Sequence, residues 1–146
     1  MAERILKYYT FPDNNAYGAS IPISSMETPF AIISTNVDAG NQVSLRVTVG
    51  WEAVKYGEDA DGKIINRTDI LFSLWRGAPI SGTLICSAMD SGEPDVDNNK
   101  TITFSQYEDD FTESQLVTYT LTARAPLYKS QANIIGGLTV VGITYK

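Results

Sequence analysis

Regular alternation of apolar and polar residues between Gln42 and Ala53 constrains the fold more than any other feature of the sequence. The apolar positions before Ala53 are Val43, Leu45, Val47, Val49 and Trp51, and polar residues or glycine separate them. Successive side chains of a β-strand point to opposite faces, so this spacing puts all five on one face. The segment therefore predicts a strand with one face buried in a core.

Six further segments show the short, turn-bounded pattern of strands. They are 31–35, 69–76, 83–88, 101–106, 115–123 and 137–146. Turn-forming residues separate them, as in Asp38-Ala39-Gly40-Asn41 and Ser91-Gly92-Glu93-Pro94. No window repeats its apolar residues at helical spacing. Short, evenly spaced strands predict an all-β fold, an antiparallel β-sandwich of the jelly-roll type.

The length of 146 residues fits one folded unit, because a chain of this size buries roughly 68–70% of its unfolded surface. We divide it into an N-terminal arm or edge strand, residues 1–28, and a jelly-roll domain, residues 29–146. The expected core contains Val47, Val49, Trp51, Phe72, Leu84, Phe104, Tyr119 and Leu121.

Charge and residue counts exclude several classes of function. The net charge of −6, with scattered Lys and Arg, disfavours nucleic-acid binding. There is no His, and the single Cys86 allows neither an intramolecular disulfide nor a Cys/His zinc site. Without a His partner, Cys86 is expected to be a small, buried, unreactive core residue rather than a nucleophile. We expect no cofactor.

The sequence shows no apolar run approaching 18 residues and no secretory signal. We therefore expect no membrane association, and synthesis as a soluble cytoplasmic protein.

The segment before Ile32 breaks the alternation of apolar and polar residues, and we predict that it forms an arm. Its apolar residues are too many for a free tail: Ile5, Leu6, Tyr8, Tyr9 and Phe11. Two alternatives stay open. The arm is an edge strand packed on its own sandwich, or it is a strand given to a neighbouring subunit. We predict that these five residues contribute to subunit contacts.

Three acidic clusters lie in predicted loops, at 58–61, 93–97 and 108–110. Carboxylate oxygens suit Ca²⁺, which makes Asp59, Asp61, Asp95 and Asp97 an alternative metal site. However, Lys100 stands where an EF-hand loop needs Gly. Solvated acidic loops are the preferred interpretation. Paired carboxylates also serve glycosidases, but nothing indicates a buried carboxyl, so we expect no enzyme.

Trp75 falls on the strand face opposite Phe72, together with Leu71. It lines an interface, or a surface that stacks on sugar rings, or both faces of this strand are covered. The sequence does not choose between these alternatives.

Five segments of the predicted domain carry a family resemblance: 42–52, 69–77, 82–93, 115–123 and 135–145. Together they resemble the exosporium protein C-like spore-surface proteins of spore-forming bacilli. The resemblance covers roughly residues 29–146. It implies a small jelly roll, similar to the trimeric tumour-necrosis-factor and complement-like heads of spore hairs, located on the spore coat or exosporium without enzymatic activity.

The expected function is therefore structural: a self-assembling component of a spore surface layer or filament. Its partners would be copies of itself, in a trimer or a polymer, and other spore-surface proteins. The alternative from another class is a carbohydrate-binding or adhesive module, for example in a phage or virus particle, that uses Trp75 and Tyr residues.

Overall fold

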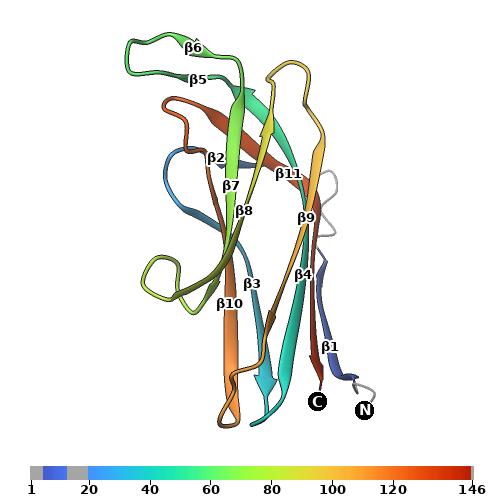
Figure 1. Cartoon of the computed structure of the whole chain (residues 1–146). Coiled ribbons are helices and arrows are strands. Elements are labelled where there is room, and N and C mark those ends of the chain that lie inside the picture. Colours follow the sequence, from blue (N-terminus) through green and yellow to red (C-terminus); the bar gives the residue numbers. More distant parts are fainter. Residues whose placement is uncertain (1–4, 13–19, 146) are drawn as a thin grey trace.

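Two antiparallel β-sheets lie face to face in the computed structural model (Figure 1). The structure describes residues 5–12 and 20–145. Sheet A contains β1 (Ile5–Pro12), β2 (Ile21–Ile23), β4 (Gln42–Lys55), β9 (Lys100–Glu108) and β11 (Gln131–Tyr145). Sheet B contains β3 (Thr28–Val37), β7 (Thr68–Arg76), β8 (Thr83–Gly92) and β10 (Gln115–Arg124). A hairpin of β5 (Gly57–Glu58) and β6 (Ile64–Ile65) projects at one end. None of the described residues belongs to a helix long and apolar enough to cross a membrane.

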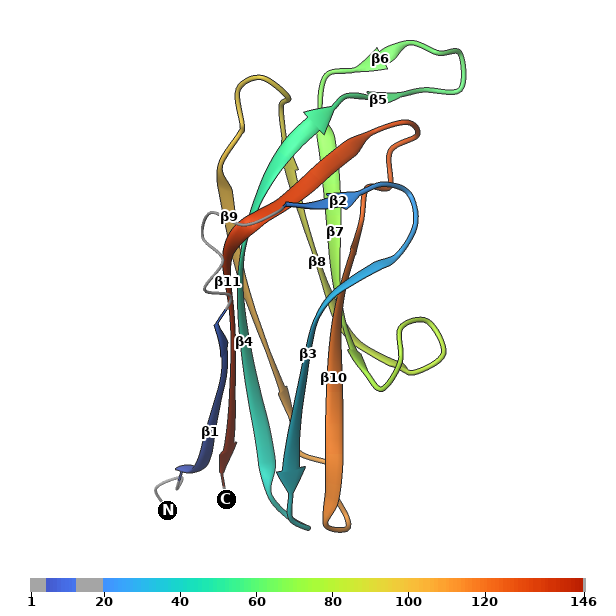
Figure 2. The ribbon, with the colours of Figure 1, turned by 180° about the vertical axis from the view of Figure 1, so that it is seen from behind.

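The strand order is that of a jelly roll. Sheet A runs β1-β11-β4-β9, with β2 also beside β11, and sheet B runs β3-β10-β7-β8. β4 pairs with β11 and β3 with β10, so strands far apart in the sequence become neighbours (Figure 2). An antiparallel chain wrapped in this way into two sheets is the jelly-roll arrangement. The predicted fold class is confirmed.

The alternation of side chains fills the space between the sheets. On β4, five residues are at most 2% exposed: Val43, Leu45, Val47, Val49 and Trp51. Phe72, Tyr119 and Leu121 of sheet B are equally buried, at 0–1% exposed. The Phe72 ring contacts those of Phe30 and Phe104, at centroid distances of 6.1 and 6.3 Å. Phe104 is half-buried at the margin of this core.

The prediction that Leu84 lies in the core is wrong, because a β-bulge interrupts β8. Leu74 pairs with Cys86 and Trp75 pairs with Leu84, so Ile85 is an extra residue. An inserted residue shifts the alternation by one, which moves Leu84 to the outer face, where it is 50% exposed. Cys86 is a free thiol that is only half-buried, less than expected. Burial raises the pKa of this thiol.

The N-terminal segment pairs within its own chain. β1 runs antiparallel to β11, with Tyr8 opposite Ile143, and β2 lies farther along the same edge. This is the edge-strand alternative. The side chains of the predicted interface residues lie outside the described part of the chain: Ile5, Leu6, Tyr8, Tyr9 and Phe11. Their role in subunit contacts stays a prediction, as does the domain division after residue 28.

Candidate interaction surface

A row of side chains crosses the outer face of sheet B. Ile32 of β3 pairs with Thr120 of β10, Thr120 with Trp75 of β7, and Trp75 with Leu84 of β8. Opposed residues of paired strands project from the same face. Leu121, the next residue along β10, is 1% exposed in the core, so this row points away from the core.

Trp75 is held in place by a chain of polar contacts on this outer face. Its Nε1 donates to the hydroxyl of Thr122 at 2.8 Å, and that hydroxyl donates to Oε1 of Glu27 at 2.5 Å. Nε of Arg124 lies 3.5 Å from Oε2 of Glu27. Thr122 is 0% exposed although it projects outward, because its neighbours cover it. The indole is therefore fixed on the surface before any partner binds.

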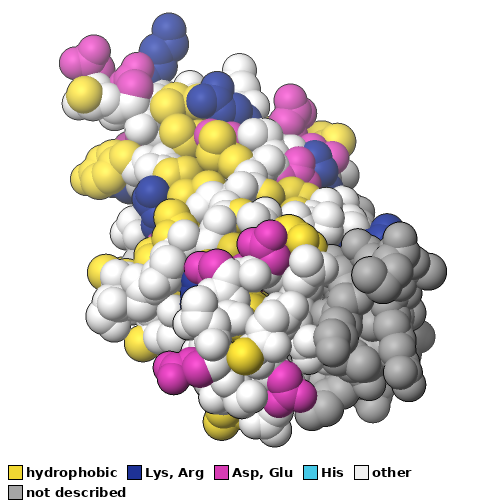
Figure 3. All heavy atoms as spheres, turned by 60° about the horizontal axis from the view of Figure 1, so that its bottom comes forward, with side chains coloured by type: hydrophobic (Ala, Val, Ile, Leu, Met, Phe, Trp, Pro, Cys, Tyr) yellow, Lys and Arg dark blue, Asp and Glu magenta, His cyan; other side chains and the backbone are white. Residues whose placement is uncertain are grey.

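Large apolar side chains are exposed on the same face of sheet B as this fixed indole. Four of them project outward from sheet B: Ile32, 57% exposed; Leu84, 50%; Met89, 60%; and Leu116, 64%. We call these four residues and Trp75 the sheet B face. Single exposed apolar residues are ordinary, but several on one face are typical of an interaction site. In Figure 3, hydrophobic side chains gather towards the side on which sheet B lies in Figure 1.

The loop between β7 and β8 adds a strained apolar residue beside this face. Ile80 has a φ of 66° and is 73% exposed. A β-branched residue rarely adopts this left-handed conformation, which costs of order 1–3 kcal/mol. The hydroxyl of Thr120 donates to the carbonyl of Gly77 at 2.9 Å, which ties the loop to the outer face of sheet B. An exposed apolar residue that is held in a strained backbone conformation favours a role for this loop in an intermolecular contact.

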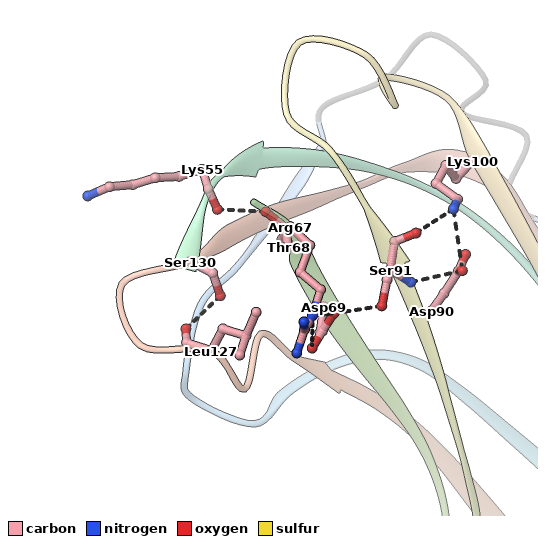
Figure 4. A network of polar contacts seen from close by, with 9 residues as sticks. All are labelled: Lys55, Arg67, Thr68, Asp69, Asp90, Ser91, Lys100, Leu127 and Ser130. Atoms are coloured by element: carbon pink, nitrogen blue, oxygen red, sulfur yellow. Dashed lines mark hydrogen bonds and ion pairs between the residues drawn. The ribbon is translucent and has the colours of Figure 1, made fainter. Parts of the chain in front are cut away.

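Polar contacts join the strands at the end that carries the β5–β6 hairpin (Figure 4). Asp90 accepts a hydrogen bond from Nε1 of Trp51 at 2.9 Å and lies 3.5 Å from Nζ of Lys100. Lys100 also donates to the backbone carbonyl of Ser91. Asp69 is 5% exposed and accepts from the Ser91 hydroxyl at 2.6 Å. These acids have protein partners, so the network stabilises the fold.

A second buried acid joins the sheets at the opposite end. Glu108 is 8% exposed; it accepts from the hydroxyl of Tyr119 at 2.6 Å, and Nη2 of Arg76 lies 2.6 Å from its other oxygen. Burial, and then the bond to Glu108, raise the pKa of Tyr119 above its usual range. The interpretation of the 108–110 cluster as solvated is therefore wrong for Glu108, although Asp109 and Asp110 are exposed.

The acids of the calcium alternative make contacts within their own loops. Asp59 accepts from the backbone N–H of Asp61 at 2.9 Å, and Asp97 from that of Glu93 at 2.6 Å. Asp95 occupies a turn with a φ of 71°. Within the described ranges, no three His, Cys, Asp or Glu side chains are grouped so that they could hold a metal ion. The calcium alternative gains no support from this geometry.

Sequence reasoning found one member of the sheet B face and missed four. Trp75 lies opposite Phe72, as predicted. Ile32 was missed because Ile33, next to it, is equally apolar, so the alternation does not show which of them points outward. Leu84 was displaced by the bulge. Met89 was missed because β8 extends beyond the expected 83–88. Leu116 lies within the expected strand 115–123, and its position between the inward residues of that strand could have placed it on the outer face.

No protein-family model and no curated protein matches the chain. Among solved structures, it is similar to infectious bursal disease virus Gx strain, with 12% identity over 96% of this chain and 36% of that chain, at a TM-score of 0.44. The T=1 particles derived from infectious bursal virus show 14% identity over 96% of this chain and 35% of that chain, at a TM-score of 0.46. The arabinose-bound MgGH51 α-L-arabinofuranosidase shows 9% identity over 97% of this chain and 23% of that chain, also at a TM-score of 0.46. The chain spans little more than a third of these chains at most, and similarity at this level carries no functional argument.

Proposed function

We propose that this protein is a structural, non-catalytic component that assembles with copies of itself through the sheet B face. The observation that carries the proposal is the set of exposed apolar side chains that share one face of sheet B with the fixed indole of Trp75. Full burial of a large apolar side chain contributes roughly 1.5–3 kcal/mol, and these four side chains, which are 50–64% exposed before the contact forms, contribute proportionately less. The fixed indole lowers the entropic cost of association, because its orientation is already set.

The finer proposal is that the assembly is a layer or filament of a spore surface, in the exosporium or coat, alongside other spore-surface proteins. Its support is the sequence resemblance of segments such as 42–52 and 69–77. Immunogold labelling of sporulating cells of the source organism tests it. Label on the outer spore layers supports this location, and label confined to other structures contradicts it.

Self-assembly is tested on purified full-length protein by negative-stain microscopy and sedimentation velocity. Leu84→Asp puts a charge beside Trp75 in the sheet B face, and it should reduce large assemblies at least tenfold, since burying an unpaired charge is costly. Val96→Asp is the matched control, because Val96 is 67% exposed in a loop away from this face. Equal assembly of Leu84→Asp and wild type contradicts the proposal.

A second candidate function rests on Trp75 itself. An indole whose N–H is occupied by Thr122, and which lies near Glu27 and Arg124, presents apolar surface beside charged groups. Such a combination suits stacking on a sugar ring, and so a carbohydrate-binding or adhesive module. Glycan-array binding that Trp75→Ala abolishes, from a protein that sediments as a monomer, would favour this candidate over self-assembly.

A further inference from the structure

The long edge strands of the two main sheets differ in charge. An edge strand exposes unpaired backbone N–H and C=O groups, and proteins usually protect it with charged residues, prolines or bulges. β1 contains Lys7, β8 contains Asp90 and a bulge, and β9 contains Lys100 and Glu108. β3 contains no charged residue along its ten positions. Of the long edge strands that the structure describes, β3 alone therefore carries no charged residue, and its proline and bulge lie only near its start.

The free side of β3 is also apolar. β3 pairs with β10, and the described part of the chain places no strand on its other side. A hollow of about 470 Å³ opens beside the first half of the strand, lined by Ile21, Pro29, Phe30, Ala31 and Ile32. Pro29 and the bulge near Phe30 interrupt the regular backbone there. Ala31–Val37 remains as seven consecutive residues of regular, uncharged edge.

We propose that two copies of this chain pair antiparallel along Ala31–Val37, about a two-fold axis at Ser34. This rests on the proposed function, because it names one of the contacts through which the protein assembles with itself. The product is one continuous eight-stranded sheet formed from the two copies of sheet B. Its outer face joins the two sheet B faces, since Ile32 belongs to both the edge and that face.

The pattern of β3 is self-complementary in this register. Ile32 lies opposite Asn36 of the second copy, and both project outward. Ile33 lies opposite Thr35 of the second copy, and both are buried on the inward side, at 9% and 3% exposed. Opposed residues must share a face in antiparallel pairing, which a register shifted by one residue would violate.

Charge does not oppose a second copy along this edge, although it does elsewhere on the surface. The chain carries a net charge of −6, so two copies repel each other over most of their surfaces. Along Ala31–Val37 no charge opposes another. Asp38 follows the run, and in this register it lies opposite Phe30 of the second copy rather than an acid. The isologous contact closes on itself, so it yields a dimer and not an open fibre.

The register makes a specific test possible, because Ser34 meets its own copy at the axis. Ser34→Lys and Ser34→Glu each put like charges directly opposite one another, and each should weaken the dimer at least tenfold by sedimentation equilibrium. An equimolar mixture of the two variants should restore the dimer as a heterodimer, which mass spectrometry identifies. Hydrogen exchange should show backbone protection of residues 31–37 that rises with protein concentration in the wild type.

The matched control is Thr103→Lys on the outer face of sheet A. The Thr103 hydroxyl lies 3.1 Å from that of Thr48, as the Ser34 hydroxyl lies 2.9 Å from that of Thr118, so both substitutions remove a cross-strand hydroxyl pair. Thermal unfolding checks that all variants fold. Edge pairing is overturned if both Ser34 variants dimerise as the wild type does, or if the mixture stays monomeric. Leu84→Asp should lose large assemblies but keep the dimer. If instead the wild type assembles, Leu84→Asp disrupts that assembly and Ser34→Lys does not, the proposed function stands without this contact.

Discussion

The outer faces of the two sheets differ although their inner faces follow the same pattern. On sheet A, Thr48 of β4 lies opposite Thr103 of β9, and Arg46 lies opposite Ser105, so this part of the face is polar. On sheet B, the row through Trp75 presents Ile32 and Leu84 to solvent. The fold requires apolar residues only at the inward positions. The apolar outward residues of sheet B are therefore not explained by folding, and the proposed contact between copies of the chain would account for them.

The largest expected effect concerns the core that both faces share. Phe72→Ala should lower the free energy of unfolding by about 3–5 kcal/mol, because Phe72 is 0% exposed and its loss leaves a cavity between the sheets. Leu84→Ala, on the outer face, should cost less than about 1 kcal/mol. Urea denaturation of both variants measures the difference. Similar losses of unfolding free energy for the two substitutions would contradict the placement of Phe72 in the core and of Leu84 on the outer surface.

The next effect concerns Glu108, whose contacts with Arg76 and Tyr119 join the two sheets at one end. Glu108→Gln should cost about 1–3 kcal/mol, since it removes the charge that pairs with Arg76, and the partial exposure of Arg76 moderates the loss. Glu113→Gln in the exposed neighbouring loop is the control and should change little. Chemical denaturation at pH 7 distinguishes them. An equal effect of both substitutions contradicts a structural role for Glu108.

These residues show how far the sequence predicts the structure. Alternation placed Val47, Trp51 and Phe72 in the core correctly, because a strand with one buried face leaves that pattern in the sequence. The same alternation could have found Glu108, which shares its strand parity with Ile102 and Phe104. Glu108 was assigned to a loop because the predicted strand ended at residue 106, whereas β9 continues to Glu108.

Other features depend on pairing partners that the sequence does not reveal. The bulge beside Ile85 and the pairing of β1 with β11 arise from contacts between distant segments. The sheet B face was only partly predictable for the same reason. A strand with apolar residues on both sides, such as Ile32 and Ile33, shows its orientation only when its neighbours are known.

The pH dependence of stability tests the buried contact between Tyr119 and Glu108. The pKa of Tyr119 is raised in the folded protein, so the unfolded chain releases this proton first as the pH rises. The stabilisation is fully present below about pH 10, the ordinary tyrosine pKa, and falls above it by about 1.4 kcal/mol per pH unit. Tyr119→Phe should remove this alkaline loss, whereas Tyr128→Phe, at a 65% exposed position, should retain it. Parallel stability curves for both variants between pH 9 and 11 contradict the assignment.

The smallest expected effect concerns the indole at the centre of the sheet B face. Trp75→Phe removes the hydrogen bond to Thr122 but keeps an aromatic ring, and the Thr122 hydroxyl still donates to Glu27. The loss should be about 0.5–1.5 kcal/mol in urea denaturation. Trp51→Phe is the matched comparison, because Trp51 also donates its N–H, to Asp90, but is 0% exposed in the core. Its replacement should cost more, because it leaves both a cavity and an acceptor that has lost a donor. Assembly should follow the opposite order: a folded Trp51→Phe protein keeps the outer face intact, whereas Trp75→Ala removes the ring that partners would contact. If Trp75→Ala assembles as the wild type does while Leu84→Asp does not, the contact is centred on β8 and the indole only supports the sheet beneath it.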